Sequence, residues 1–228
     1  MDHLNQTQSP LRVDFAGGWL DVPRFSRPNA YIVNCAIQPF VSLSQWPYHR
    51  NSGLGGSAAW AMLNGNDGLQ SELSMGVGWQ DPAVIYETGL CVWRSGSEPI
   101  LDFKRTGKML KGKMALYWTG KPHNTPLAAD IHRDFDDIQK AGDIAREAVL
   151  QENMDDLARS IRLSYQAQLA EGMRSLPHIV NSIAWKYCGG GWGGYALYLF
   201  STEHHRNRFA DTEVGTRIEP YLRNDLEH

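Results

Sequence analysis

Residues 9–21 read Ser9-Pro10-Leu11-Arg12-Val13-Asp14-Phe15-Ala16-Gly17-Gly18-Trp19-Leu20-Asp21. The β-branched and aromatic run at residues 13–16 predicts a short strand, with Arg12 at its start. Gly17 and Gly18 then let the backbone approach another group closely before Asp21. Taken alone, such an arginine and aspartate are typical of solvated surface. Two further glycine clusters, one in the middle and one near the end of the chain, indicate a functional role for them.

The middle cluster, at residues 53–59, reads Gly53-Leu54-Gly55-Gly56-Ser57-Ala58-Ala59. Glycines followed by a serine and helix formers would present bare backbone N–H groups and a helix N-terminus, which favour an anionic phosphate. Glycine-rich turns also enter many helices that bind nothing. The stretch is not a Walker motif, because no Gly-Lys-Ser/Thr follows it. It is also a poor dinucleotide fingerprint, because no clear strand precedes it and no acidic ribose partner follows at the expected distance.

The last cluster is Gly189-Gly190-Gly191-Trp192-Gly193-Gly194. Consecutive glycines cost backbone entropy, so a compact domain is expected to keep them only where side chains cannot fit. A flexible linker fits poorly here, because the apolar run at residues 195–200 follows at once and predicts a buried strand. We therefore expect this cluster to lie close to the phosphate-binding loop.

The other segments alternate between strand-like and helix-like patterns. Further strands are predicted at residues 31–37, 90–93, 100–103 and 114–118. Helices are predicted at residues 58–63, 136–150, 157–169 and 177–185. Asn153 is placed to cap the helix at 157–169, with acidic residues in its first turn. Strands first, helices next and a strand last make an α+β pattern.

The composition excludes several classes of protein. The 228 residues carry a formal net charge of -3, whereas nucleic-acid binding depends on a concentrated excess of lysine and arginine. A small-molecule partner fits better. Three cysteines without a CxxC pair predict neither a disulfide framework nor a zinc site, and suit a reducing cytoplasm. The sequence shows neither a basic leader nor an apolar run of ~20 residues, so we expect neither export nor membrane insertion. Residues 226–228 look like an expression-tag remnant.

Together and in this order, the three clusters resemble the signature motifs of the GHMP kinases, the galactokinase, homoserine kinase, mevalonate kinase and phosphomevalonate kinase superfamily. The first motif is most similar to that of the sugar-1-kinase branch, which includes fucokinases and heptose 7-phosphate kinases. The resemblance spans Pro10 to about Phe200. It implies a two-lobed α+β fold, with a ribosomal S5 domain 2-like lobe at residues 1–112 and a ferredoxin-like lobe at residues 113–223.

The resemblance also implies catalytic and acceptor-binding residues. Residues 78–82 match the family segment whose aspartate faces the acceptor hydroxyl, which makes Asp81 the candidate catalytic carboxylate. Arg12 would lie near the transferring phosphoryl group, where its planar fork matches phosphate oxygens. Asp21, with Gly17 and Gly18, would hold the acceptor.

By the same resemblance, the chain would bind ATP and Mg²⁺. The residues implied at the ATP phosphates are Gly53, Gly55, Gly56, Ser57 and Ala58. Gly56 stands where the family usually has its first serine. Ser57 and Glu72 would be the Mg²⁺ ligands. The glycines implied to support the phosphate loop are Gly190, Gly191 and Gly193.

Two segments, residues 37–53 and 59–78, are shorter than their counterparts in the family, so we expect a reduced nucleotide pocket. The function implied is ATP-dependent phosphorylation of a sugar or sugar phosphate at the anomeric hydroxyl. The alternative is a catalytically impaired relative that acts as a sugar- or nucleotide-binding module. A nucleotide-binding oxidoreductase is a third reading that rests on the glycines alone.

Overall fold

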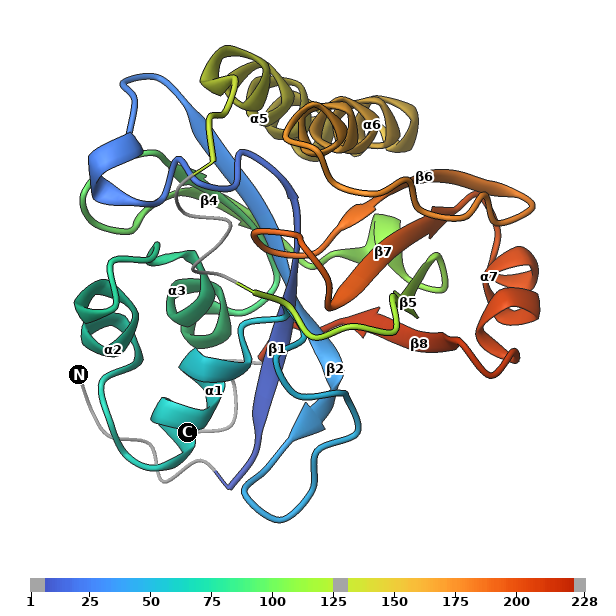
Figure 1. Cartoon of the computed structure of the whole chain (residues 1–228), viewed down its shortest axis with the longest axis horizontal. Helices are drawn as coiled ribbons and strands as arrows, with labels where there is room; N and C mark the ends of the chain where they lie inside the picture. Colours follow the sequence, from blue (N-terminus) through green and yellow to red (C-terminus); the bar gives the residue numbers. More distant parts are fainter. Residues whose placement is uncertain (1–6, 125–130, 224–228) are drawn as a thin grey trace.

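The computed structural model describes residues 7–124 and 131–223, so the suspected tag remnant at 226–228 lies outside the described residues. In this part of the chain, antiparallel strands form an eight-stranded sheet in the order β4-β3-β2-β8-β5-β7-β6, with β1 paired to β2. Helices lie on both sides of the first four strands (Figure 1). The expected α+β class is confirmed, because mixed helices and an antiparallel sheet make up the fold.

From residue 7 onward, the N-terminal half supplies four strands and three α-helices. The strands are β1 (Ser9–Ala16), β2 (Tyr31–Val41), β3 (Leu90–Arg94) and β4 (Ile100–Arg105). The helices are α1 (Gly56–Leu63), α2 (Gly68–Ser74) and α3 (Gln80–Glu87). Short 3-10 turns lie at Pro23–Phe25 and Lys108–Leu110. The predicted short helix after the middle glycine cluster and the hairpin near residue 95 are confirmed.

In residues 113–124 and 131–223, the C-terminal half supplies the other four strands and three α-helices. The strands are β5 (Met114–Trp118), β6 (Ser182–Tyr187), β7 (Tyr195–Phe200) and β8 (Gly215–Pro220). The helices are α5 (Phe135–Leu150), α6 (Met154–Ala170) and α7 (Glu203–Ala210). Strand β8 pairs with β5 and, through Ile37 and Gln38, with β2. The last strand thereby joins the two groups of strands in one sheet.

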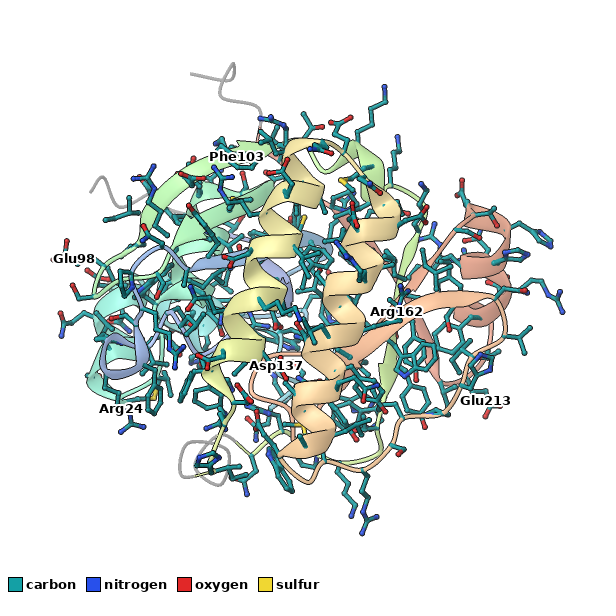
Figure 2. The ribbon with its side chains drawn as sticks, turned by 90° about the horizontal axis from the view of Figure 1, so that it is seen from above. Arg24, Glu98, Phe103, Asp137, Arg162 and Glu213 are labelled. Atoms are coloured by element: carbon teal, nitrogen blue, oxygen red, sulfur yellow. The ribbon has the colours of Figure 1, made fainter. Side chains whose placement is uncertain are left out.

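Helices α5 and α6 run side by side over one face of the sheet (Figure 2). Their buried faces are lined with small and branched apolar residues such as Ala141, Ala145 and Ile161. Asn153 caps α6 as predicted, because its side chain accepts hydrogen bonds from the first-turn N–H groups of Asp155 and Asp156. Within residues 7–124 and 131–223, no helix is long and apolar enough to cross a membrane.

One large core cluster draws residues from both halves of the chain. Leu11 and Val33 come from the N-terminal half, and Leu116, Ala145 and Leu197 come from the C-terminal half. All five side chains are fully buried. The division into lobes at 112 and 113, between a 3-10 turn and β5, therefore stays a prediction.

The predicted helix at Pro177 to Trp185 is wrong. Residues 182–187 form β6, which pairs with β7. Its aromatic side chains explain the strand, because the Trp185 ring stacks on Tyr198 of β7 with centroids 5.9 Å apart. Pairing with β7 therefore determines the conformation of this segment more than its local helical pattern does.

Candidate active site

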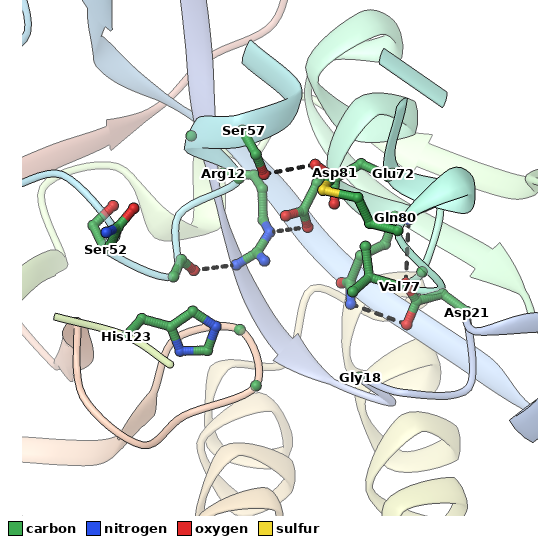
Figure 3. Close-up of a pocket in the computed structure, with 18 of the residues that line it drawn as sticks. Arg12, Gly18, Asp21, Ser52, Ser57, Glu72, Val77, Gln80, Asp81 and His123 are labelled. Atoms are coloured by element: carbon green, nitrogen blue, oxygen red, sulfur yellow. Dashed lines mark hydrogen bonds and ion pairs between the residues drawn. The ribbon is translucent and has the colours of Figure 1, made fainter. Parts of the chain in front are cut away.

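Loops from both halves of the chain enclose a cavity of about 980 Å³. Arg12 lies near the centre of Figure 3, with Asp81 and Glu72 on one side and His123 on the other. Residues from all three glycine clusters line this cavity. The polar and glycine residues that line it include Arg12, Asp21, Ser57, Glu72, Asp81 and Gly190.

The middle glycine cluster forms the loop that leads into α1, and this loop packs against β1. The Arg12 N–H donates to the Leu54 carbonyl at 3.0 Å, which fixes the loop against β1. Gly55 is the N-cap of α1 with φ +76°, and a side chain there would lie 3.3 Å from both Arg12 and Asp81. No side chain caps this helix. Its first N–H groups are therefore available to an anion in the cavity.

The last glycine cluster packs directly on the segment that leads into this loop. Gly194 has φ +72°, and a Cβ there would lie 2.4 Å from the Ser52 carbonyl oxygen. The Tyr195 N–H donates to the same carbonyl at 2.9 Å. Since the two backbones leave no room for a side chain, the predicted close approach of the two clusters is confirmed.

Arg12 connects the loop to the candidate catalytic carboxylate. Its Nε donates to Asp81 Oδ1 at 2.6 Å, and its Nη1 donates to the Gly53 carbonyl at 2.7 Å and to Asp14 Oδ1 at 3.1 Å. Burial alone would lower the pKa of Arg12, but Asp81 and Asp14 outweigh it and raise that pKa. The guanidinium is therefore a permanent cation at the centre of the site.

Asp14 is buried behind Arg12 and holds a second cation, Lys186 of β6. Lys186 Nζ donates to Asp14 Oδ2, and the Gly189 N–H donates to Oδ1 at 2.7 Å. Burial would raise the pKa of Asp14, but Lys186 and Arg12 more than offset this, so the pKa lies below its ordinary value. Sequence reasoning missed both Asp14 and Lys186. A lysine within an otherwise apolar segment was the available signal for Lys186.

Asp21 is fixed by the segment that carries Asp81. Asp21 accepts hydrogen bonds from the backbone N–H of Gln80 at 3.2 Å and from the Gln80 amide at 3.1 Å. The Trp19 N–H adds a third, at 3.1 Å. Burial, with a contribution from nearby Asp81, raises the pKa of Asp21 to about 7. Near neutral pH this carboxyl can therefore both donate and accept hydrogen bonds at the cavity wall.

Ser57 of α1 and Glu72 of α2 meet although they lie 15 residues apart in the sequence. The Ser57 hydroxyl donates to Glu72 Oε1 at 2.6 Å. Burial and the Asp81 charge raise the pKa of Glu72 above its ordinary value. Both residues offer oxygen ligands, which Mg²⁺ prefers, and Mg²⁺ commonly takes only one or two protein carboxylates beside phosphate and water. The pair therefore fits that ion, although no cluster of three acidic, histidine or cysteine side chains suited to a metal occurs among the described residues.

Comparison with solved structures identifies the fold. The Methanococcus jannaschii mevalonate kinase superposes with a TM-score of 0.70 at 13% identity, over 94% of this chain and 98% of that one. A D-glycero-D-manno-heptose 1-phosphate kinase from Bacteriodes thetaiotaomicron gives 0.62 at 15% identity, over 93% and 95%. The Streptococcus pneumoniae phosphomevalonate kinase, in complex with phosphomevalonate and AMPPNP, gives 0.62 at 12% identity, over 94% and 99%.

This chain has the GHMP kinase fold. No protein-family model and no curated protein sequence matches it. At such low identities the likeness concerns the fold, and the residues within the site have to carry any functional argument.

The segment at residues 37–53 contributes side chains to the cavity wall. Trp46 and Arg50 from this segment and Trp60 from α1 form a cluster, with the Arg50 guanidinium 3.8 Å above the Trp46 ring and 5.1 Å from that of Trp60. A side chain at Gly56 would lie 3.3 Å from Trp46. The segment at residues 37–53 thus contributes an aromatic and cationic wall to the cavity, and Trp46 lies close to Gly56.

Sequence reasoning also missed other residues that line the cavity. His123, which was not among the predicted site residues, lies against the Gly191 carbonyl, and its pKa is lowered mainly by burial. Trp19, Arg24 and Met75 also line the cavity. These positions have no glycine motif or fixed spacing that would reveal them.

Four of the predicted site residues do not line the cavity. Gly17 packs against β2, where a Cβ would clash with the Tyr31 carbonyl, and Ala58 is fully buried in the core. Gly191 lies near Met173, and Gly193 lies against the Pro122 carbonyl. Their positions indicate support of the backbone. The other predicted residues all line the one cavity.

Proposed function

We propose that this protein is an ATP-dependent kinase that phosphorylates a hydroxyl of a sugar or sugar phosphate, with the anomeric hydroxyl as acceptor. The observation that carries this proposal is the pair of hydrogen bonds from one buried guanidinium. Arg12 reaches the phosphate loop through the Gly53 carbonyl and the Asp81 carboxylate through Nε. A phosphoryl donor and a hydroxyl acceptor would thus meet across a fixed cation.

Phosphoryl transfer through a loose transition state asks mainly for positioning and charge neutralisation. The α1 N-terminus supplies N–H donors for the phosphates, and the Arg12 charge stabilises the transferring group. Asp81 orients the acceptor hydroxyl and takes its proton late in the reaction. Asp21 hydrogen-bonds a second acceptor group, which holds the reacting hydroxyl in line.

Ser57 and Glu72 would hold Mg²⁺, which neutralises charge on the phosphate oxygens when bound. The nucleobase would lie against the wall formed by Trp46, Arg50 and Trp60. Aromatic rings and a guanidinium suit a planar base, because stacking and cation–π contacts need no particular hydrogen-bond pattern. The cavity then accommodates donor and acceptor from opposite ends.

The test is ATP consumption over a panel of monosaccharides and their phosphates, with the product position assigned by NMR. We expect Asp81→Asn to lower kcat by about 100-fold or more while the variant stays folded. The matched control is Glu98→Gln, which removes an exposed carboxylate outside the cavity and should leave kcat unchanged.

Three outcomes are informative. Turnover that depends on Asp81 supports the proposal. Sugar binding by calorimetry, with neither ATP binding nor turnover, would replace it with a binding module. Equal turnover by the parent and Asp81→Asn would exclude the assigned role of this carboxylate.

A further inference from the structure

Asp14 and Lys186 form a buried ion pair outside the cavity. Asp14 is 2% exposed and Lys186 is 3% exposed, and neither lines the cavity. Burying a lysine in a strand is costly unless it is paired and hydrogen-bonded. Asp14 provides both the ion pair and the hydrogen bonds for Lys186, because Nζ donates to the Asp14 carboxylate and to the Asp14 backbone carbonyl, the latter at 3.2 Å. The proposed transfer uses neither side chain directly.

The bonds that Asp14 makes to Arg12 are fewer than the chemistry allows. An arginine and a carboxylate commonly form two parallel N–H···O bonds. Arg12 and Asp14 lie two residues apart on β1, on the same face, yet only Nη1 bonds to Oδ1. The second oxygen, Oδ2, accepts from Lys186 instead, and Oδ1 is shared with the Gly189 N–H. The Nε of Arg12 is thereby left to Asp81.

We propose that Lys186 is a positioning residue for Arg12. Lys186 occupies the second carboxylate oxygen of Asp14, and this prevents Asp14 and Arg12 from forming two parallel hydrogen bonds. Such a pair would draw the guanidinium away from Asp81. This inference rests on the proposed function for its kinetic consequence. Two cations and two carboxylates alternate in a chain, from Lys186 to Asp14, then to Arg12 and Asp81. Removing the terminal cation leaves Asp14 and Asp81 to compete for one guanidinium.

The inference predicts an unusual pattern in a double-mutant cycle. Lys186→Met should lower kcat by up to about 100-fold, because small displacements of a reacting group have effects of this size, with little change in the KM for the acceptor. Adding Asp14→Asn should restore at least a tenth of the parent kcat, because an amide cannot form the two-bond pair. Lys186→Arg, which keeps a donor to Oδ2, should also retain activity. Lys140→Met, at an exposed position on α5, is the control.

A purely structural role for the ion pair predicts a different pattern. Lys186→Met, Asp14→Asn and the double variant would then all lose stability, and kcat would follow the folded fraction measured by circular dichroism. The inference is overturned if the folded double variant is no more active than Lys186→Met, or if Lys186→Met keeps the parent kcat.

A second readout is independent of turnover. In protein labelled with ¹⁵N-arginine, the Arg12 Nε–H signal, assigned by its loss in Arg12→Lys, should exchange slowly because it is buried and bonded to Asp81. The signal should shift and exchange faster in Lys186→Met, and return toward the parent position in the double variant. An unchanged signal in Lys186→Met overturns the inference. If the parent phosphorylates no acceptor, the proposed function fails while this measurement still decides the role of Lys186. If Lys186→Met does not fold, the same comparison uses Lys186→Gln.

Discussion

Asp14 and Asp21 are both buried carboxyls of the first motif, yet their surroundings shift their pKa values in opposite directions. Lys186 and Arg12 overcome the effect of burial at Asp14 and lower its pKa. At Asp21, burial and the Asp81 charge outweigh the hydrogen bonds that the carboxyl accepts and the attraction of Arg12, and its pKa rises to about 7. Ionised Asp14 therefore stabilises the folded protein at pH values above its ordinary pKa, whereas ionised Asp21 destabilises the folded protein.

We expect the stability of the ligand-free protein to fall as pH rises from about 4 to about 7. In this window unfolded Asp21 has released its proton while folded Asp21 retains it, so the native state binds more protons and the free energy of unfolding decreases with pH. Asp21→Asn should remove up to about 4 kcal/mol of this pH dependence. Urea unfolding at several pH values measures it, with Glu98→Gln as control. Parallel profiles for parent and Asp21→Asn would contradict the prediction.

At the scale of elements, the sequence predicted best those segments that local periodicity determines. The helices α5 and α6 could be predicted because apolar residues recur on one face and Asn153 caps α6. Strand β6 was predicted as a helix because its pairing with β7 is a tertiary contact. That error also hid Lys186, since its partner Asp14 lies 172 residues away in the sequence.

The candidate site was predictable where backbone geometry restricts the residue type. Glycine clusters are visible in a sequence because the loop around Gly55 has no room for side chains. The contact between Ser57 and Glu72 was suggested only through the family resemblance. Trp46, Arg50 and His123 follow no periodic pattern, and only the folded chain brings them to the cavity.

The wall formed by Trp46, Arg50 and helix α1 gives a prediction about the donor. Trp60 is 44% exposed at the cavity, and base stacking contributes about 1–3 kcal/mol. We therefore expect Trp60→Ala to weaken ADP binding, measured by calorimetry, by about tenfold, with little change in the KM for the acceptor. Tyr86→Ala is a matched control, because this aromatic residue is 45% exposed and does not line the cavity. Equal affinities in parent and Trp60→Ala would locate the base elsewhere.

For the molecule as a whole, the contact between the last glycine cluster and residue 52 couples the stability of the fold to the phosphate loop. Gly194→Ala would place a Cβ 2.4 Å from the Ser52 carbonyl oxygen in a left-handed backbone conformation. We expect it to lower the free energy of unfolding by about 3 kcal/mol or more, since strain and a clash add, and to weaken ADP binding. Urea unfolding and calorimetry measure the two effects.

Gly120→Ala is the control for that substitution. Gly120 has φ +79°, close to that of Gly194, but no atom lies within 4 Å of its added Cβ. It should therefore show only the cost of the left-handed conformation, about 1 kcal/mol. Equal destabilisation by the two substitutions would show that the packing of the two backbones contributes nothing.

Two parts of the cavity wall differ in how well they tolerate substitution. At Gly55 and Gly194 the wall is built from closely packed backbone with little space for new side chains, so we expect most substitutions there to destabilise the fold. Other parts of the cavity wall are built from side chains, and one of them, Met75, is 57% exposed. Under the proposed function, substitutions in this part of the wall should alter which acceptor is bound while the glycine loop stays unchanged. A library confined to positions 24, 75 and 77 should yield folded variants with new acceptor preferences.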